Sequence, residues 1–170
     1  AGAGGLLLTQ GYRMERITVW LDPAASEKGH QTIQGLYAIG SGGLFGKGLG
    51  QSMQKLGFLP EANNDMIFSV ICEELGLFGA LCVLALFFAL IWRFMVIAVN
   101  APDLYGSMIV VGVIAHIGIQ VFINIAVATN TIPNTGIPLP FISYGGSSLV
   151  FMLLEMGLVL SVSRYINVKK

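Results

Sequence analysis

The sequence predicts an all-α polytopic membrane protein: three transmembrane helices, the end of a preceding one, and a large extracytoplasmic loop with short interfacial helices. The first reason is composition, because 55% of the 170 residues are hydrophobic and only 11% are charged. The second is length, since three apolar runs reach or approach the ~20 residues with which an α-helix crosses ~30 Å of hydrocarbon. Such runs are too long for the interior of a small soluble domain.

The three transmembrane helices are expected at residues 66–99, 108–129 and 147–164, where the apolar runs lie. Two connections follow from this assignment, a cytoplasmic loop at 100–107 and an extracytoplasmic Pro/Gly loop at 130–146. Three prolines and three glycines between Ile132 and Ser148 exclude a continuous helix there and favour a rigid, partly re-entrant loop.

The remaining segments lie at the two ends of the chain. Residues 1–9 are apolar but too short to span a membrane, and they are expected to be the end of a truncated transmembrane helix. The chain is therefore expected to be the C-terminal piece of a longer protein. Residues 10–65 form the large extracytoplasmic loop, and residues 165–170 form a cytoplasmic tail.

The large loop contains two stretches with helical spacing. Apolar residues recur near helical spacing from Tyr12 to Leu21, beside two arginines, which predicts an interfacial helix that Asp22-Pro23 ends. Residues 31–39 are expected to form a second short helix.

A glycine-rich stretch, residues 40–50, follows these helices. It is not a phosphate-binding loop, because Ser41 replaces the first glycine of that motif and Gly48 replaces the magnesium-binding Ser or Thr. Two interpretations stay open: a flexible loop whose glycines allow positive φ, or a site where Lys47 and backbone amides bind an anionic headgroup.

Charge and cysteine content narrow the function classes. Nine Lys or Arg balance nine Asp or Glu, so the bulk electrostatic attraction for nucleic acid is absent. Cys72 and Cys82 lie too far apart along one expected helix to form a disulfide with each other, and they are interpreted as small apolar side chains.

Basic residues near the helix ends predict the orientation. Arg93, Arg164 and the two C-terminal lysines flank the helices on one side, whereas the 130–146 loop has neither Lys nor Arg. The C-terminus is therefore expected in the cytoplasm. The outer loop is nevertheless basic, which indicates an anionic ligand there. Its basic residues are Arg13, Arg16, Lys28, Lys47 and Lys55.

Asp65 stands where the outer loop meets the first long apolar run. A carboxylate at the edge of a bilayer is costly and often functional, but one of Asn63, Asn64 and Asp65 is also expected to cap the helix. Glu73 and Glu74 are too far around and along the helix to form a carboxylate pair with Asp65. They are interpreted as loop-facing residues that snorkel at the start of the span.

A polar stripe follows one side of the second span and must face protein or water. Its members recur every four residues: Gly112, His116, Gln120 and Asn124. Glu155, near the middle of the third span, is expected to hydrogen-bond to His116 or Gln120. A metal site at His116 is not expected, because no cysteine or second histidine accompanies it.

Three motifs together resemble those of a known family. They are GGLFGKGLGQSMQKL at 42–56, LPEANND at 59–65 with EELG at 73–76, and PLPFISYGGSS at 138–148. In this order they resemble the SEDS family of bacterial cell-wall proteins, FtsW, RodA and SpoVE, over essentially the whole chain. The chain is similar to the large outer loop and the last helices of that family.

The resemblance implies a peptidoglycan glycosyltransferase that polymerises lipid II, a disaccharide-pentapeptide on an undecaprenyl diphosphate, outside the bacterial cytoplasmic membrane. It implies lipid II, membrane lipids and a class B penicillin-binding protein transpeptidase as partners. It leaves open a role in division, elongation or sporulation. The alternatives are a lipid II flippase, in which His116 and Glu155 would line a path, and a module that only activates a partner synthase.

The resemblance also implies roles for individual residues. The family's essential acidic residue matches Asp65, although neighbouring positions differ, with Asn63-Asn64 and Met66 in place of His-Thr and Phe. As catalytic base, Asp65 would take the proton from the attacking sugar 4-hydroxyl while the lipid diphosphate leaves from the opposite face. The leaving group needs positive charge, and a divalent cation as cofactor is left open. The substrate-binding candidates are Arg13, Arg16, Lys47 and Lys55; no metal ligand is assigned.

Overall fold

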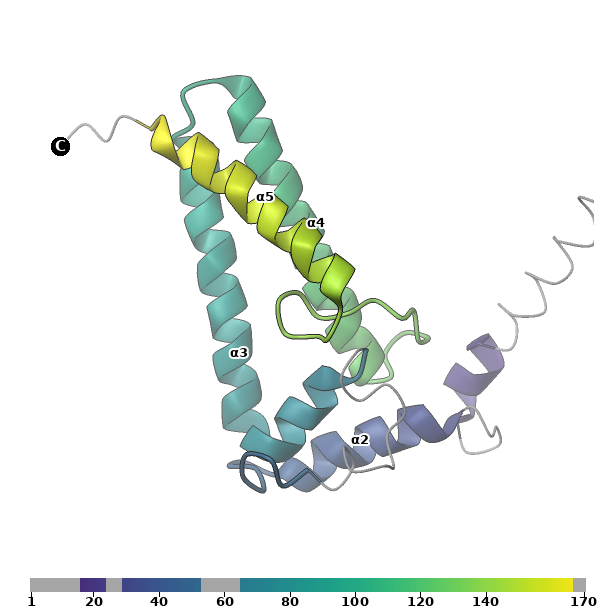
Figure 1. Ribbon diagram of the computed structural model, residues 1–170. Helices are drawn as coiled ribbons and strands as arrows, with labels where there is room; N and C mark the ends of the chain where they lie inside the picture. Colours follow the sequence, from purple (N-terminus) through teal and green to yellow (C-terminus); the bar gives the residue numbers. More distant parts are fainter. Residues whose placement is uncertain (1–15, 24–28, 53–64, 167–170) are drawn as a thin grey trace, which may run out of the picture.

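The computed structural model describes residues 16–23, 29–52 and 65–166, and within these residues every regular element is helical. Three long helices, α3 (Ile67–Val99), α4 (Leu104–Ala128) and α5 (Gly146–Arg164), form a bundle, and α2 (His30–Gly42) lies across one end of it (Figure 1). Residues 16–21 form a further short helix. The three bundle helices are long and apolar enough to cross a membrane, which confirms the predicted fold class.

The helix ends differ slightly from the predicted ones. Helix α4 begins at Leu104 rather than at residue 108, because the Asp103 side chain accepts a hydrogen bond from the Gly106 backbone N–H and caps the helix. The connection between α3 and α4 is correspondingly short. The stretch predicted at 1–9 lies outside the described residues, and so do residues 167–170 of the predicted C-terminal tail.

Helix α3 is broken at Gly76, a feature that the apolar pattern did not predict. Gly76 has φ 68° and ψ −167°, a combination that is essentially restricted to glycine. The first half of the helix, 67–75, therefore leaves at a steep angle from the upright second half (Figure 1). Residues 77–99 alone cover about 35 Å at ~1.5 Å per residue, enough to cross the hydrocarbon.

Helix α2 packs along the first half of α3 through a seam of small residues. Gly35, Ala38 and Gly42 are the buried residues of α2. A Cβ at Gly42 would overlap the backbone of Cys72, and one at Gly35 would meet the Ser69 hydroxyl at 3.3 Å. The small side chains thus allow the outer-loop helix and the half-helix to lie in direct contact.

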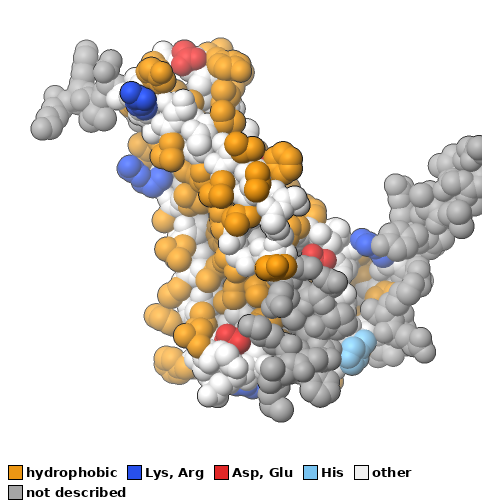
Figure 2. Space-filling view, in the orientation of Figure 1, with side chains coloured by type: hydrophobic (Ala, Val, Ile, Leu, Met, Phe, Trp, Pro, Cys, Tyr) orange, Lys and Arg blue, Asp and Glu red, His pale blue; other side chains and the backbone are white. Residues whose placement is uncertain are grey.

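The core of the bundle is apolar and is shared by all three long helices. Phe87 and Phe94 of α3 pack with Ile117 of α4 and with Met152 and Val159 of α5. Many large side chains point outward instead, and Figure 2 shows mostly hydrophobic side chains along the visible side of the bundle. Such a surface suits contact with lipid or with further transmembrane helices.

Candidate active site

Asp65 lies at the start of α3, close to the loop that joins α4 to α5. A Cβ built on Gly136 of this loop would lie 3.4 Å from Asp65 Oδ2, so the carboxylate faces the loop backbone. The helix-capping position belongs to Met66, which makes no side-chain cap bond. Asp65 therefore does not occupy the N-cap position, while Asn63 and Asn64 lie outside the described residues.

Asn124 holds Asp65 and the loop together. Its Nδ2 donates hydrogen bonds to the backbone oxygens of Asp65 and Ile137, each at 2.9 Å, and its side chain is only 1% exposed. Asn124 is the last member of the polar stripe predicted on the second span. The stripe does face protein there, and this residue fixes the backbone of Asp65 against the loop.

The loop itself is braced by internal hydrogen bonds. The Asn134 side chain accepts a bond from the Gly136 N–H, and the Ser143 hydroxyl accepts one from the Leu139 N–H at 2.7 Å. Phe141 adopts a positive φ of 62°, an uncommon conformation for a residue with a side chain. The predicted Pro/Gly loop thus has a defined conformation that its own hydrogen bonds stabilise.

The short helix at 16–21 docks on the same loop. Arg16 Nη1 donates to the backbone oxygen of Asn134 at 2.6 Å, and Trp20 Nε1 donates to that of Asn130 at 2.9 Å. One predicted substrate-binding arginine therefore lies at the loop that Asp65 faces. Two of the other three candidates, Arg13 and Lys55, lie outside the described residues.

Lys47 lies elsewhere, at the break in α3. Its Nζ is 2.7 Å from Oε1 of Glu73, whose side chain is completely buried. The interpretation of Glu73 as a snorkelling residue is wrong, because loop residues enclose and pair its carboxylate. Lys47 remains 34% exposed, but its charge is already matched by a buried carboxylate.

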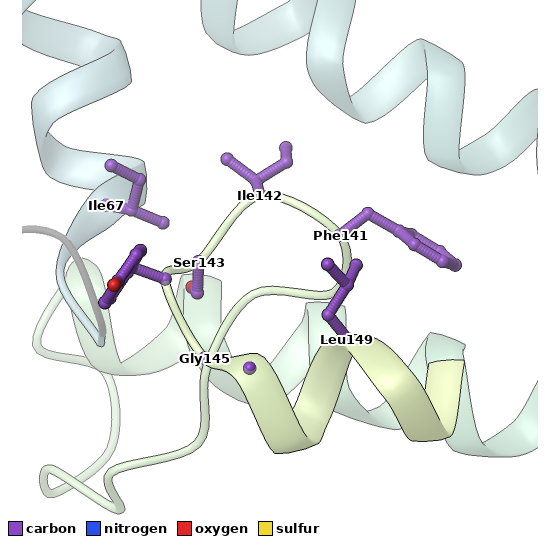
Figure 3. Close-up of a pocket in the computed structure, with 8 residues that line it drawn as sticks. Ile67, Phe141, Ile142, Ser143, Gly145 and Leu149 are labelled. Atoms are coloured by element: carbon purple, nitrogen blue, oxygen red, sulfur yellow. The ribbon is translucent and has the colours of Figure 1, made fainter. Parts of the chain in front are cut away.

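An apolar cavity of about 320 Å³ lies beside the start of α3 (Figure 3). Ile67, two residues after Asp65, lines one wall, and the 141–146 segment and Leu149 of α5 line the others. The residues that line this cavity are mostly apolar and none of them is charged, so the cavity suits a hydrocarbon chain. A substrate with an apolar chain and a polar head would find both environments within a few residues of Asp65.

His116 and Glu155 form a separate polar pair between α4 and α5, as predicted. His116 Nδ1 and Glu155 Oε1 are 2.7 Å apart. Among the described residues no hydrogen bond joins Gln120 to this pair, and the buried Gln120 Oε1 accepts none there. Across the described ranges, no three of His, Cys, Asp and Glu come together as a metal site.

Comparisons with known proteins agree with this architecture. A family model described as cell cycle protein, for FtsW, RodA and SpoVE, matches residues 3–168. Stage V sporulation protein E of Bacillus subtilis is 56% identical over 169 residues, which cover 97% of this chain and 46% of that protein. A probable peptidoglycan glycosyltransferase FtsW of Geobacter sp. strain M18 is 44% identical over 93% of this chain and 44% of its own length.

Solved structures show the same relationship. A peptidoglycan synthase complex, described for its structural coordination of polymerization and crosslinking, matches 93% of this chain and 43% of its own with a TM-score of 0.70 and 31% identity. The rod shape determining protein RodA of Thermus thermophilus matches 77% of this chain and 39% of its own, with a TM-score of 0.59 and 38% identity.

The chain spans less than half the length of these relatives. Its match to the family model nevertheless extends over nearly all of its residues, and its three apolar helices identify a membrane protein. The chain belongs to the FtsW, RodA and SpoVE family of cell cycle proteins.

Proposed function

We propose that the protein containing this chain is a peptidoglycan glycosyltransferase that polymerises lipid II into glycan strands at the outer face of the bacterial cytoplasmic membrane. The observation that carries the proposal is the position of Asp65. Its carboxylate faces Gly136, and its backbone is fixed to the loop by Asn124. The relative named as a probable peptidoglycan glycosyltransferase supports the same chemistry.

Asp65 is proposed to act as the general base. It takes the proton from the sugar 4-hydroxyl of one substrate as that oxygen attacks the anomeric carbon of another, and the C–O bond to the diphosphate breaks on the opposite face. Asn124 contributes by holding the Asp65 backbone, so that the carboxylate needs little reorganisation during the reaction.

The departing diphosphate requires positive charge. Arg16, at the loop that Asp65 faces, is the best placed of the described basic residues, and Arg13 and Lys55 are proposed to share this role. The apolar cavity beside Ile67 offers room for part of the isoprenoid chain. Lys47 is left out of the substrate contacts, because its ammonium is paired with buried Glu73.

Two further proposals concern the setting of the reaction. The C-terminus is proposed to be cytoplasmic, because Arg164 is the last residue of α5 and Arg93 lies near the end of α3, and both helices end away from the 130–146 loop (Figure 1). A class B penicillin-binding protein transpeptidase is the proposed partner, in keeping with the similar structure described for polymerization and crosslinking.

Polymerisation of labelled lipid II by the full-length protein in detergent tests the function. Asp65→Asn is expected to abolish glycan chains without affecting membrane insertion. Asp103→Asn is the matched control, because the same change at the other end of the bundle keeps a capping side chain and should leave activity intact. A flippase would give no chains even with the natural sequence, since detergent removes the two sides of the membrane.

A further inference from the structure

The break in α3 leaves four backbone groups without their helical partners. In an unbroken helix the N–H groups of Leu77 and Phe78 would bond to the oxygens of Glu73 and Glu74. All four groups are instead paired with the glycine-rich loop. The Lys47 and Gly48 N–H groups donate to the Glu73 and Glu74 oxygens at 2.9 and 3.0 Å, and Leu77 and Phe78 donate to the Gly43 and Leu44 oxygens at 2.9 and 3.1 Å.

This exchange requires two backbones to approach each other without side chains between them. Gly46 and Gly76 have φ values of 75° and 68°, and a Cβ on either one would overlap backbone atoms of the other segment. Gly46 of the loop and Gly76 of the helix therefore serve a close contact, and the loop is anchored at this point rather than flexible.

Side chains of the glycine-rich loop also contact α3 at this point, and they surround Glu73. Its carboxylate is fully buried and receives the Lys47 ammonium at 2.7 Å and the Ser52 hydroxyl, with the Ser41 hydroxyl at 3.5 Å. A buried carboxylate is strongly destabilising if its cation is removed, whereas removing both charges together is often tolerated. The Lys47–Glu73 pair is therefore suited to holding the loop and the first half of α3 in one relative position.

We propose that residues 41–52 form a clamp that positions the half-helix 67–75, with Lys47 and Glu73 as its positioning residues. The proposal rests on the assignment of Asp65 as the base. Asp65 lies about 16 Å from Gly76 at the helical rise of ~1.5 Å per residue. A tilt of about 4° at Gly76 would thus move Asp65 by about 1 Å, and a displacement of that size can cost about 10²-fold in rate.

The clamp and a direct substrate contact by Lys47 predict different kinetics. If Lys47 binds the lipid diphosphate, Lys47→Met raises KM and a second change at Glu73 cannot repair the loss. If Lys47 acts in the clamp, the single variant leaves the buried Glu73 carboxylate without its cation, so kcat falls while KM changes little. The double variant Lys47→Met/Glu73→Gln then regains much of the rate.

The experiment measures kcat, KM and the thermal midpoint of the full-length protein with labelled lipid II in detergent. For Lys47→Met and Glu73→Gln we expect kcat to fall by about 10²-fold with KM within about threefold. The double variant should recover at least about tenfold in kcat relative to Lys47→Met and have a higher thermal midpoint than that variant. Lys47→Arg, which keeps the charge, should retain most of the activity.

A raised KM in Lys47→Met that persists in the double variant would overturn the proposal. Additive losses of thermal stability in the two single variants would overturn it as well. The stability comparison needs no catalysis, so it judges the clamp even if a single variant is inactive through misfolding. Activity retained by Asp65→Asn would instead reject the assignment of the base, and the two failures are therefore distinguishable.

Discussion

Replacing Asn124 with leucine tests how firmly the site depends on one buried amide. The two side chains have similar size, but leucine removes both donors that hold the Asp65 and Ile137 oxygens. Each lost bond at a partly buried oxygen costs about 0.5–1.5 kcal/mol, which gives about 1–3 kcal/mol for the pair. The rate of polymerisation should fall by more than this loss of stability explains, because Asp65 loses its fixed position relative to the loop.

The assay follows glycan-chain synthesis and the thermal midpoint of the full-length protein in detergent. Asn124→Leu is expected to lower the rate by at least about tenfold while the protein remains folded. Asn100→Leu is the matched control, since the Asn100 side chain makes a local, exposed bond to the Val96 oxygen at the far end of α3. Full polymerisation activity in Asn124→Leu would refute the view that this amide positions the site.

Three further changes test other parts of the structure. Glu155→Gln should be tolerated because an amide still bonds His116, whereas Glu155→Leu should lower the thermal midpoint by leaving His116 unsatisfied; equal midpoints would argue against the pair. Arg16→Gln should weaken lipid II binding in a vesicle assay more than it lowers stability, and a loss of expression with unchanged binding would make Arg16 a structural anchor on Asn134. Gly76→Ala should cost about 1–3 kcal/mol or more, since alanine fits neither the backbone angles nor the contact with the loop, and an unchanged midpoint would contradict the observed break.

Much of the fold follows from patterns that the sequence displays locally. The apolar runs predicted the three long helices, and the four-residue spacing of His116, Gln120 and Asn124 predicted a polar stripe that faces protein or water. The pairing of Glu155 with His116 was predictable because a carboxylate within a span must find a partner. Each of these inferences needs only helical periodicity and the cost of burying charge.

The break at Gly76 and the pairing of Lys47 with Glu73 were missed for a different reason. A glycine within an apolar run is common in membrane helices and does not reveal its φ. The partner of Glu73 lies 26 residues earlier in the chain, so only the folded arrangement brings the two together. A usable signal was present nevertheless, because a carboxylate within an apolar segment calls for a nearby cation.

The most direct test of the central claim measures substrate binding and polymerisation on one preparation of the full-length Asp65→Asn variant. If Asp65 is the general base, labelled lipid II should bind within about threefold of the natural protein. Glycan-chain synthesis should meanwhile fall by at least about 10²-fold, the usual contribution of a positioned base. Chain synthesis close to the natural rate in a variant that binds lipid II normally would contradict the claim.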